Sequence, residues 1–164
     1  MSKIDNVITD VLTKEGGGKV SNDSADKGGR TQYGISETAN PSAWKDGSVS
    51  EKEAREIYLQ KYVIGTGYVK IPPSHGKVQA QLIDFGVHSG PAIATMKLQS
   101  LLGVTVDGVL GPKTLAALAQ TEPREINNKL VLARAEMICR LVTKQPSQLR
   151  FLWGWLNRTL SFYY

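Results

Sequence analysis

The chain contains a single cysteine, Cys139, and only two histidines among its 164 residues. A lone cysteine cannot form an internal disulfide, and the sequence has no cluster of Cys and His at the spacing of a metal site. We therefore expect no metal ion and no other cofactor. Because Cys139 falls in an apolar helical stretch, we expect its thiol to be buried and inert.

Long apolar runs are also absent from the sequence. No segment approaches the roughly 18 consecutive apolar residues that cross a membrane as a helix. Residues 1–12 alternate charged and apolar side chains and lack the apolar core of a signal peptide. We expect synthesis in the cytosol, so action outside the cytosol requires a separate partner that releases the protein.

Acidic side chains are outnumbered by basic ones, and the formal net charge is +5. A basic protein is attracted to polyanions, which include nucleic acids, acidic membrane surfaces and cell-wall polymers. The sequence lacks a helix-turn-helix signature and an aromatic nucleic-acid motif, so we expect no nucleic-acid partner. Hydrophobic residues make up 41% and charged residues 21%, which is typical of a globular protein and excludes general disorder.

Apolar side chains recur at helical spacing through most of the chain, which predicts a mainly α-helical fold. In the first half of the chain, we expect helices over residues 3–14, after a capping box at Ser50 and Glu53, and over residues 75–88. In the second half, we expect helices from residue 91 to about 102, after Gly111-Pro112, from Pro123 to near Pro146, and around residues 151–156. The apolar face of the longest helix is expected to run through Ile126, Leu130, Ala133, Met137 and Leu141.

Residues 15–36 differ from the rest of the chain because they are rich in Gly, Asn, Asp, Ser and Lys. This composition predicts a small lobe made of a loop or a short β-hairpin. No internal repeat or Gly/Ser linker divides the sequence. We therefore predict one domain over residues 1–164, with a catalytic lobe over 1–75 and a helical lobe over 76–164.

Two carboxylates in the small lobe are candidates for chemistry. Glu15 ends the first helix and precedes Gly16-Gly17-Gly18, so its side chain can lean into a cleft and act as a general acid if apolar neighbours desolvate it. Asp26 follows eleven residues later. Glycoside hydrolysis uses two carboxylates in different environments. Thr31 could hold a water molecule, and Tyr33 could offer a sugar its ring or its hydroxyl.

Each of these residues has a simpler interpretation on its own. A Glu at a helix end is usually solvated, and Asp26-Lys27-Gly28-Gly29 is typical of an ordinary turn. Thr31 and Tyr33 alternate with Gln32 as in a strand, so they could serve packing alone. Only the combination of residues indicates an active site.

Taken together, Glu15-Gly16-Gly17 and Asp26-x-Gly28-Gly29-x-Thr31-x-Tyr33-Gly34-Ile35 resemble the active-site signature of the glycoside hydrolase family 108 muramidases. These are phage endolysins and related bacterial wall hydrolases. The resemblance implies a lysozyme-like fold and cleavage of the β-1,4 bond between N-acetylmuramic acid and N-acetylglucosamine in peptidoglycan, which lyses bacteria. It also implies that Glu15 is the catalytic acid, Asp26 the second carboxylate and Thr31 the water-positioning hydroxyl.

The candidates for substrate binding are Tyr33, Gln32, Tyr62 and His88. His88 lies beside a helix end and could contact substrate, but a lone histidine more often serves a structural hydrogen bond, so both interpretations stay open. Relatives often carry Trp where this chain has Val63 and Asn where it has His88, so sugar contacts near these two positions are expected to differ. We expect a monomer that is made in the host cytoplasm and acts in the periplasm after holin-type release.

The second half of the sequence resembles the predicted peptidoglycan-binding region of that family. The resemblance is carried by Asp84-Phe85-Gly86-Val87-His88-Ser89-Gly90-Pro91, Leu98-Gln99-x-x-Leu102-Gly103, and Asp107-Gly108-x-x-Gly111-Pro112-x-Thr114. Two interpretations stay open here. The glycines and proline could serve only the turn between two helices, or the region could bind the wall independently.

The C-terminal segment is basic and aromatic, with no acidic residue after Glu136. Its basic residues are interleaved with aromatic ones, as the list Arg140, Lys144, Arg150, Phe151, Trp153, Trp155, Arg158, Phe162, Tyr163 and Tyr164 shows. This pattern predicts contact with an anionic outer-membrane surface. The alternative is that Trp155 and Leu156 belong to the core and that the charges form a solvated face.

Two other functions remain compatible with the sequence. A lytic transglycosylase would use one acid and no water, and would therefore not need Asp26. A non-catalytic wall-binding phage protein would keep its affinity for the wall after Glu15→Gln.

Overall fold

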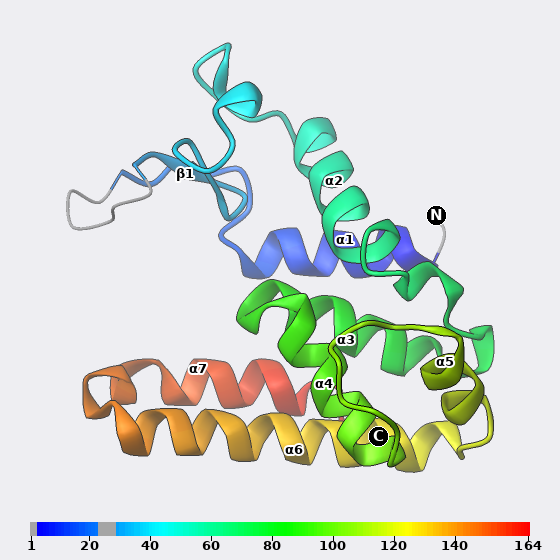
Figure 1. The fold of residues 1–164 in the computed structure, drawn as a ribbon. Coiled ribbons are helices and arrows are strands. Elements are labelled where there is room, and N and C mark those ends of the chain that lie inside the picture. Colours follow the sequence, from blue (N-terminus) through cyan, green and yellow to red (C-terminus); the bar gives the residue numbers. More distant parts are fainter. Residues whose placement is uncertain (1–2, 23–28) are drawn as a thin grey trace. The chain divides into compact units, whose positions relative to one another are not determined.

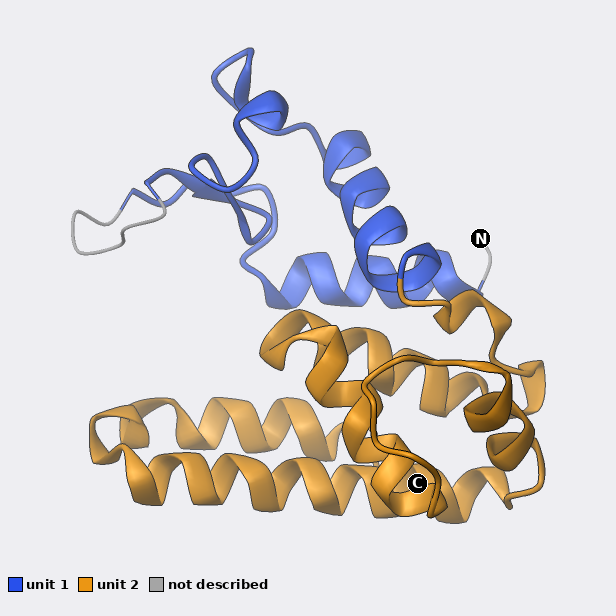
Figure 2. Cartoon of the chain, in the orientation of Figure 1, with its two compact units in different colours: residues 1–65 blue, residues 66–164 orange. Residues whose placement is uncertain are grey.

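The computed structural model describes residues 3–22 and 29–164 (Figure 1). The chain divides into two compact units, residues 1–65 and 66–164 (Figure 2). The division falls after Gly65 rather than after residue 75, where the sequence predicted the end of the first lobe. That the two units form one domain stays a prediction. Among the described residues, no helix combines the length and the apolarity that a membrane span requires.

The described part of the first unit contains two α-helices, a small hairpin and two short helical turns of other types. Its elements are α1 (Lys3–Lys14), β1 (Thr31–Gln32), β2 (Ile35–Ser36), the 3-10 helix η1 (Pro41–Trp44), α2 (Glu51–Leu59) and the π-helical turn η2 (Gln60–Ile64). The predicted capping box is present, since Ser50 Oγ accepts from Glu53 N and the Glu53 carboxylate accepts from Ser50 N. A hydrogen bond of 2.8 Å from Arg55 Nη2 to Thr9 Oγ1 joins α2 to α1.

The β-hairpin is short and has a small core of its own. Thr31 pairs with Ser36 and Gln32 with Ile35, in antiparallel register. Tyr33 and Gly34 form the turn with φ angles of +52° and +71°, the left-handed conformations typical of tight hairpin turns. Ile35 is buried with Trp44, whose Nε1 donates to the Ile35 carbonyl at 3.2 Å. The predicted small lobe is therefore a hairpin with an apolar base.

The second unit is helical. Its elements are the 3-10 helices η3 (Tyr68–Lys70) and η4 (Pro73–His75), α3 (Gly76–Ser89), α4 (Pro91–Leu102), α5 (Pro112–Ala119), α6 (Pro123–Lys144), the 3-10 helix η5 (Pro146–Gln148) and α7 (Leu149–Leu160). Proline stands at the first position of α4, α5 and α6. A backbone N–H at this position has no partner within the helix, so its absence in proline costs no helical hydrogen bond. α6 and α7 lie side by side as a helical hairpin (Figure 1). α3 has a fully buried apolar face made of Val78, Leu82, Ile83 and Phe85.

The buried face of α6 differs from the predicted one. It runs through Ile126, Leu130, Val131, Arg134, Ile138 and Val142. Arg134 takes a core position because Asp84 neutralises its charge there, and the face then continues one residue beyond the predicted Ala133 and Met137. Leu141 is consequently 37% exposed. Cys139 is exposed as well, so the prediction of a buried thiol was wrong.

The turn between α4 and α5 is organised by the buried side chain of Gln99. Its Nε2 donates to Asp107 Oδ1 at 2.7 Å and to the Val109 carbonyl at 2.9 Å. Its Oε1 accepts from the backbone N–H groups of Asp107 and Gly108. One amide thus satisfies several backbone groups of the Asp-Gly-x-x-Gly-Pro segment. These bonds hold the turn between α4 and α5, and independent binding of the wall by this region stays a prediction.

Candidate active site

Glu15 follows the last turn of α1 and is half-buried. Its backbone N–H donates to Val11 O at 2.9 Å, and Gly17 N donates to Leu12 O at 2.9 Å. Gly16 and Gly17 then have φ angles of +91° and +57°. Since residues with a Cβ rarely adopt such angles, the glycines allow the chain to reverse immediately after Glu15.

The hairpin turn lies directly against the Glu15 side chain. A Cβ placed on Gly34 would lie 3.1 Å from both Cβ and Oε2 of Glu15, and 2.7 Å from the hydroxyl of Tyr58. The Tyr58 hydroxyl donates to the carbonyl of Tyr33 at 2.8 Å. The end of α1, the hairpin turn and α2 therefore meet at one point, and a glycine makes this contact possible.

Thr31 and Tyr33 lie on the same hairpin. The backbone of Thr31 pairs on one side with Ser21, through hydrogen bonds of 2.8 and 2.9 Å, and on the other with Ser36. Tyr33 N donates to Gly17 O at 3.1 Å, and its ring lies over Gly18, where a Cβ would be 2.8 Å from the Tyr33 hydroxyl. The structure therefore joins Tyr33 to the glycine turn that follows Glu15, and it pairs Thr31 with Ser21, which lies after that turn in the sequence.

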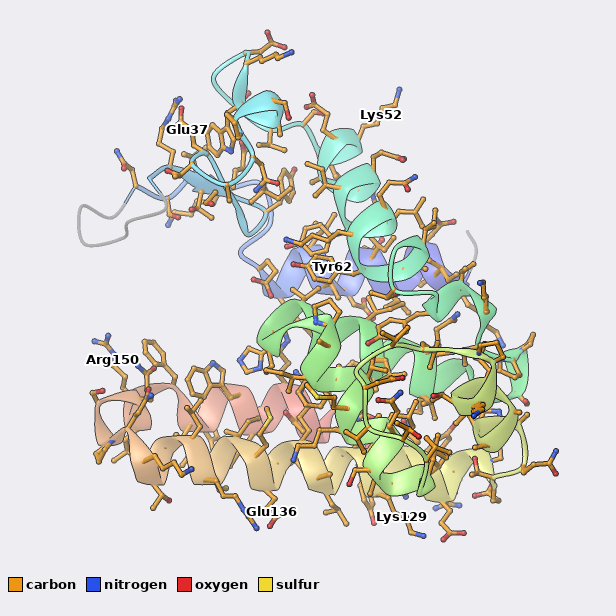
Figure 3. The ribbon with its side chains drawn as sticks, in the orientation of Figure 1. Glu37, Lys52, Tyr62, Lys129, Glu136 and Arg150 are labelled. Atoms are coloured by element: carbon orange, nitrogen blue, oxygen red, sulfur yellow. The ribbon has the colours of Figure 1, made fainter. Side chains whose placement is uncertain are left out.

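Gln32 and Tyr62 have different surroundings. The Gln32 amide donates to Gly18 O and accepts from Val49 N, both at 2.8 Å, so it ties the glycine turn to the segment before α2. Tyr62 lies in η2, and its ring centroid is 5.3 Å from that of Tyr58 (Figure 3). Val63, at the position where relatives often carry Trp, is fully buried. The substrate-binding roles of Gln32 and Tyr62 stay predictions.

Asp26 lies outside the described residues. The distance between its carboxylate and that of Glu15 is therefore not part of the structure, and its role stays a prediction. Among the described residues, no group of three or more His, Cys, Asp or Glu side chains is arranged to hold a metal ion.

His88 belongs to the second unit, near the end of α3. Its ring meets the ring of Trp155 edge-on, with centroids 5.3 Å apart and an interplanar angle of 65°. Burial, and then the positive charges of Arg134 and Arg158, lower the pKa of His88 to about 4, while Asp84 opposes the shift. The imidazole is therefore neutral near pH 7.

An ion cluster beneath His88 was not predicted from the sequence. Arg134 Nη2 lies 2.8 Å from Asp84 Oδ2, and both side chains are fully buried. Arg158 Nε donates to both oxygens of Asp84 at 2.9 and 3.1 Å. The Arg134 guanidinium also lies over the Phe85 ring, 4.9 Å from its centroid. One carboxylate thus connects α3, α6 and α7.

Comparison of the sequence with models of known protein families shows which family the chain belongs to. A family model described as "Glycosyl hydrolase 108" matches residues 8–90, just over half of the chain, including Glu15 and the whole hairpin. The chain belongs to glycosyl hydrolase family 108. A second model, described as "Predicted Peptidoglycan domain", matches residues 93–160. Together they identify this family 108 protein as a peptidoglycan hydrolase, and they confirm the resemblance of both halves of the sequence.

A solved structure is similar to the family 108 chain over nearly its whole length. It is titled "Structure of Brucella abortus SagA", has 31% sequence identity and a TM-score of 0.71, and the match covers 96% of this chain and 90% of that one. The predicted mainly α, lysozyme-like fold is thereby confirmed. No curated protein matches the chain.

Proposed function

We propose that this family 108 chain hydrolyses the β-1,4 bond between N-acetylmuramic acid and N-acetylglucosamine, with Glu15 as the general acid. The observation that carries the proposal is the position of Glu15. Its side chain is half-buried at the end of α1 and lies against the hairpin turn at Gly34. A carboxyl group whose position is restricted by a neighbouring turn is pre-organised to meet a substrate oxygen.

The proposed reaction uses two functional groups besides Glu15. Protonated Glu15 donates its proton to the glycosidic oxygen as the bond to the anomeric carbon breaks. Asp26 activates water or stabilises the positive charge that develops at this carbon. Thr31 assists by holding the water, which adds to the anomeric carbon and leaves a reducing muramic acid end. Tyr33, Gln32 and Tyr62 are proposed to contact the sugar.

Clearing of a peptidoglycan suspension tests the role of Glu15. Glu15→Gln keeps the shape of the side chain and removes its acid, so we expect loss of clearing by at least about a hundredfold. The matched control is Glu56→Gln, which replaces an exposed carboxylate on α2 of the same unit and should clear like the parent. Equal clearing by Glu15→Gln and the parent would remove Glu15 from the mechanism.

The alternatives make different products or none. A lytic transglycosylase leaves anhydro ends and is indifferent to Asp26→Asn. A non-catalytic wall-binding protein clears nothing, and its affinity for the wall is the same in the parent and in Glu15→Gln. Hydrolysis requires that Asp26→Asn lowers clearing and that the new ends are reducing.

We further propose a biological role as a phage endolysin that kills bacteria by lysis. It would be made in the host cytoplasm and would reach peptidoglycan in the periplasm after release by a holin-type partner. Expression in a Gram-negative host with and without a co-expressed holin tests this role. Lysis only with the holin is expected, while prompt lysis without it would contradict the proposed route.

The outward side of α7 supports a proposed contact with an anionic outer-membrane surface. Leu149, Trp153 and Leu160 are 62%, 75% and 48% exposed, and helical periodicity places them on one side of the helix. Exposed Arg150 and Lys144 add positive charge nearby. Binding to vesicles with an anionic lipid should weaken in Trp153→Ala. Unchanged vesicle binding by this variant would contradict the proposed contact.

A further inference from the structure

A row of three rings runs along one side of the second unit. Phe151 and Trp155 lie one turn apart on α7, with ring centroids 5.5 Å apart and an interplanar angle of 27°. The Trp155 ring meets His88 at 5.3 Å. We call these three residues the aromatic strip. Phe151 is 40% exposed, and the other two rings are half-buried, so the strip faces solvent.

The strip differs from the outward side of α7. Trp153 and Trp155 are two residues apart, and the helical period of 3.6 residues turns their side chains about 200° from each other. Trp153 is 75% exposed, whereas Trp155 packs between two other rings. The same helix therefore has two tryptophans in contrasting surroundings.

The strip has a rigid base. Arg158, one turn after Trp155, is held by Asp84 through its Nε. Asp84 in turn pairs with Arg134 of α6 at 2.8 Å. Thr159 is buried and its hydroxyl donates to Trp155 O at 2.8 Å. The ion pairs of Asp84 link α7 to α3 and α6, so the helix that carries Phe151 and Trp155 is in place before a ligand binds.

We propose that the aromatic strip binds a sugar ring of the peptidoglycan glycan strand by stacking. The C–H face of a pyranose ring is apolar and matches the ring of Phe151, the most exposed ring of the strip, which stacks on Trp155. The hydroxyl and N-acetyl groups of the sugar need hydrogen-bond partners. His88 supplies such a partner beside the rings. This inference rests on the proposed function for its substrate. Phe151 and Trp155 lie in the segment that matches the peptidoglycan domain, and His88 lies in the segment that matches family 108.

The polar imidazole of His88 beside the rings favours a glycan strand over a lipid surface as the occupant. The low pKa of His88 keeps its imidazole neutral. Its Nδ1 lies 3.4 Å from the Ser89 hydroxyl, so Nε2 is the nitrogen that can form a hydrogen bond with a sugar group. The Arg150 guanidinium lies 4.6 Å from the centre of the Phe151 ring, at the start of α7 (Figure 3). Its positive charge suits the carboxylates of the peptides that glycan strands carry.

Co-sedimentation with purified sacculi tests the strip separately from catalysis. All variants carry Glu15→Gln so that bound wall is not digested. We expect Trp155→Ala to weaken binding by about fivefold to tenfold, as the loss of a stacked aromatic contact would. Trp155→Phe should recover much of the affinity, and Trp153→Ala should bind like the parent. A strip with no role predicts equal binding by Trp155→Ala, and a loss as large in Trp153→Ala would also overturn the proposal.

Two further measurements separate the possible causes of each outcome. Sacculi freed of their peptides by an amidase should keep the difference between Trp155→Ala and the parent, because the proposed ligand is the sugar. If the difference vanishes, the ligand is the peptide and the proposal is wrong. Soluble fragments released by the Glu15→Gln parent would contradict the proposed catalytic acid instead, and the relative binding of the strip variants would still be read from the pelleted fraction.

Discussion

Glu15 lies against the α-carbon of Gly34, so closely that a Cβ on Gly34 would come within 3.1 Å of the Glu15 carboxylate. The contact joins the end of α1 to the turn between β1 and β2, two segments that no regular secondary structure connects. It restricts the positions that the acid can take on the side of the hairpin. The first two predictions follow from this contact.

Gly34→Ala should impair catalysis more than it impairs folding. The added methyl group must displace either Glu15 or the Tyr58 hydroxyl, and misplacing a catalytic group typically costs on the order of 10- to 100-fold in rate. Gly47→Ala is the control, because Gly47 has a similar φ of +80° but open space around a Cβ. Both should lose about 1 kcal/mol of stability from the left-handed conformation. Equal clearing rates for the two variants would contradict the positioning role of Gly34.

Tyr58→Phe should lower activity by about threefold to tenfold with a small loss of stability. The substitution removes the hydrogen bond to the Tyr33 carbonyl, which contributes about 1 kcal/mol, and frees the turn that contacts Glu15. Tyr68→Phe is the control, since the Tyr68 hydroxyl is also buried and bonded, to Thr95 at 2.9 Å in the second unit. Urea unfolding should show similar losses for both, while clearing should fall only in Tyr58→Phe.

The His88 imidazole should make stability depend on pH between about 6.5 and 4. Its pKa is about 4 in the folded chain and about 6.5 when unfolded. The unfolded state therefore binds more protons in this window, and the free energy of unfolding falls as pH is lowered through it. His88→Asn should show a shallower fall in urea unfolding at pH 7, 5.5 and 4.5. Identical pH profiles would show that His88 titrates normally.

Substitutions of Asp84 and of Arg134 should destabilise the second unit to different extents. Asp84→Asn leaves the buried guanidinium of Arg134 and that of Arg158 without their carboxylate, so it should destabilise the second unit by about 3–5 kcal/mol. Arg134→Met removes one of two cations from a single carboxylate and keeps the volume, so it should cost less than about 1.5 kcal/mol. Thermal and urea unfolding measure both, and a larger loss for Arg134→Met would contradict the account.

The helix boundaries could be predicted because their signals are local. The capping residues Ser50 and Glu53, the glycines after Glu15 and the prolines that open α4 to α6 act within one turn of where they stand. The buried face of α6 could not be predicted in the same way. A buried Arg134 depends on Asp84, fifty residues away in the sequence, and periodicity alone assigns a charged residue to the surface.

The part of the candidate site that lies in one continuous stretch of sequence, residues 15–35, could be predicted. Glu15, Thr31 and Tyr33 lie within 19 residues of one another. The hairpin that carries Thr31 and Tyr33 contacts Glu15 through Gly34. Tyr58 was not predicted as part of the site, because its hydrogen bond to the Tyr33 carbonyl joins residues 25 positions apart in the sequence. The surroundings of Gln32 could not be predicted either. Its side-chain amide forms hydrogen bonds with the backbone of Gly18 and Val49, and Val49 is distant in the sequence.

The chemistry of the ends made from purified peptidoglycan tests the central claim most directly. Digests by the parent and by Glu15→Gln would be reduced with borohydride and analysed by mass spectrometry. The account predicts N-acetylmuramitol ends from the parent and almost none from Glu15→Gln. Anhydromuramic ends, N-acetylglucosaminitol ends, or equal release by both proteins would contradict hydrolysis of the muramic acid bond by Glu15.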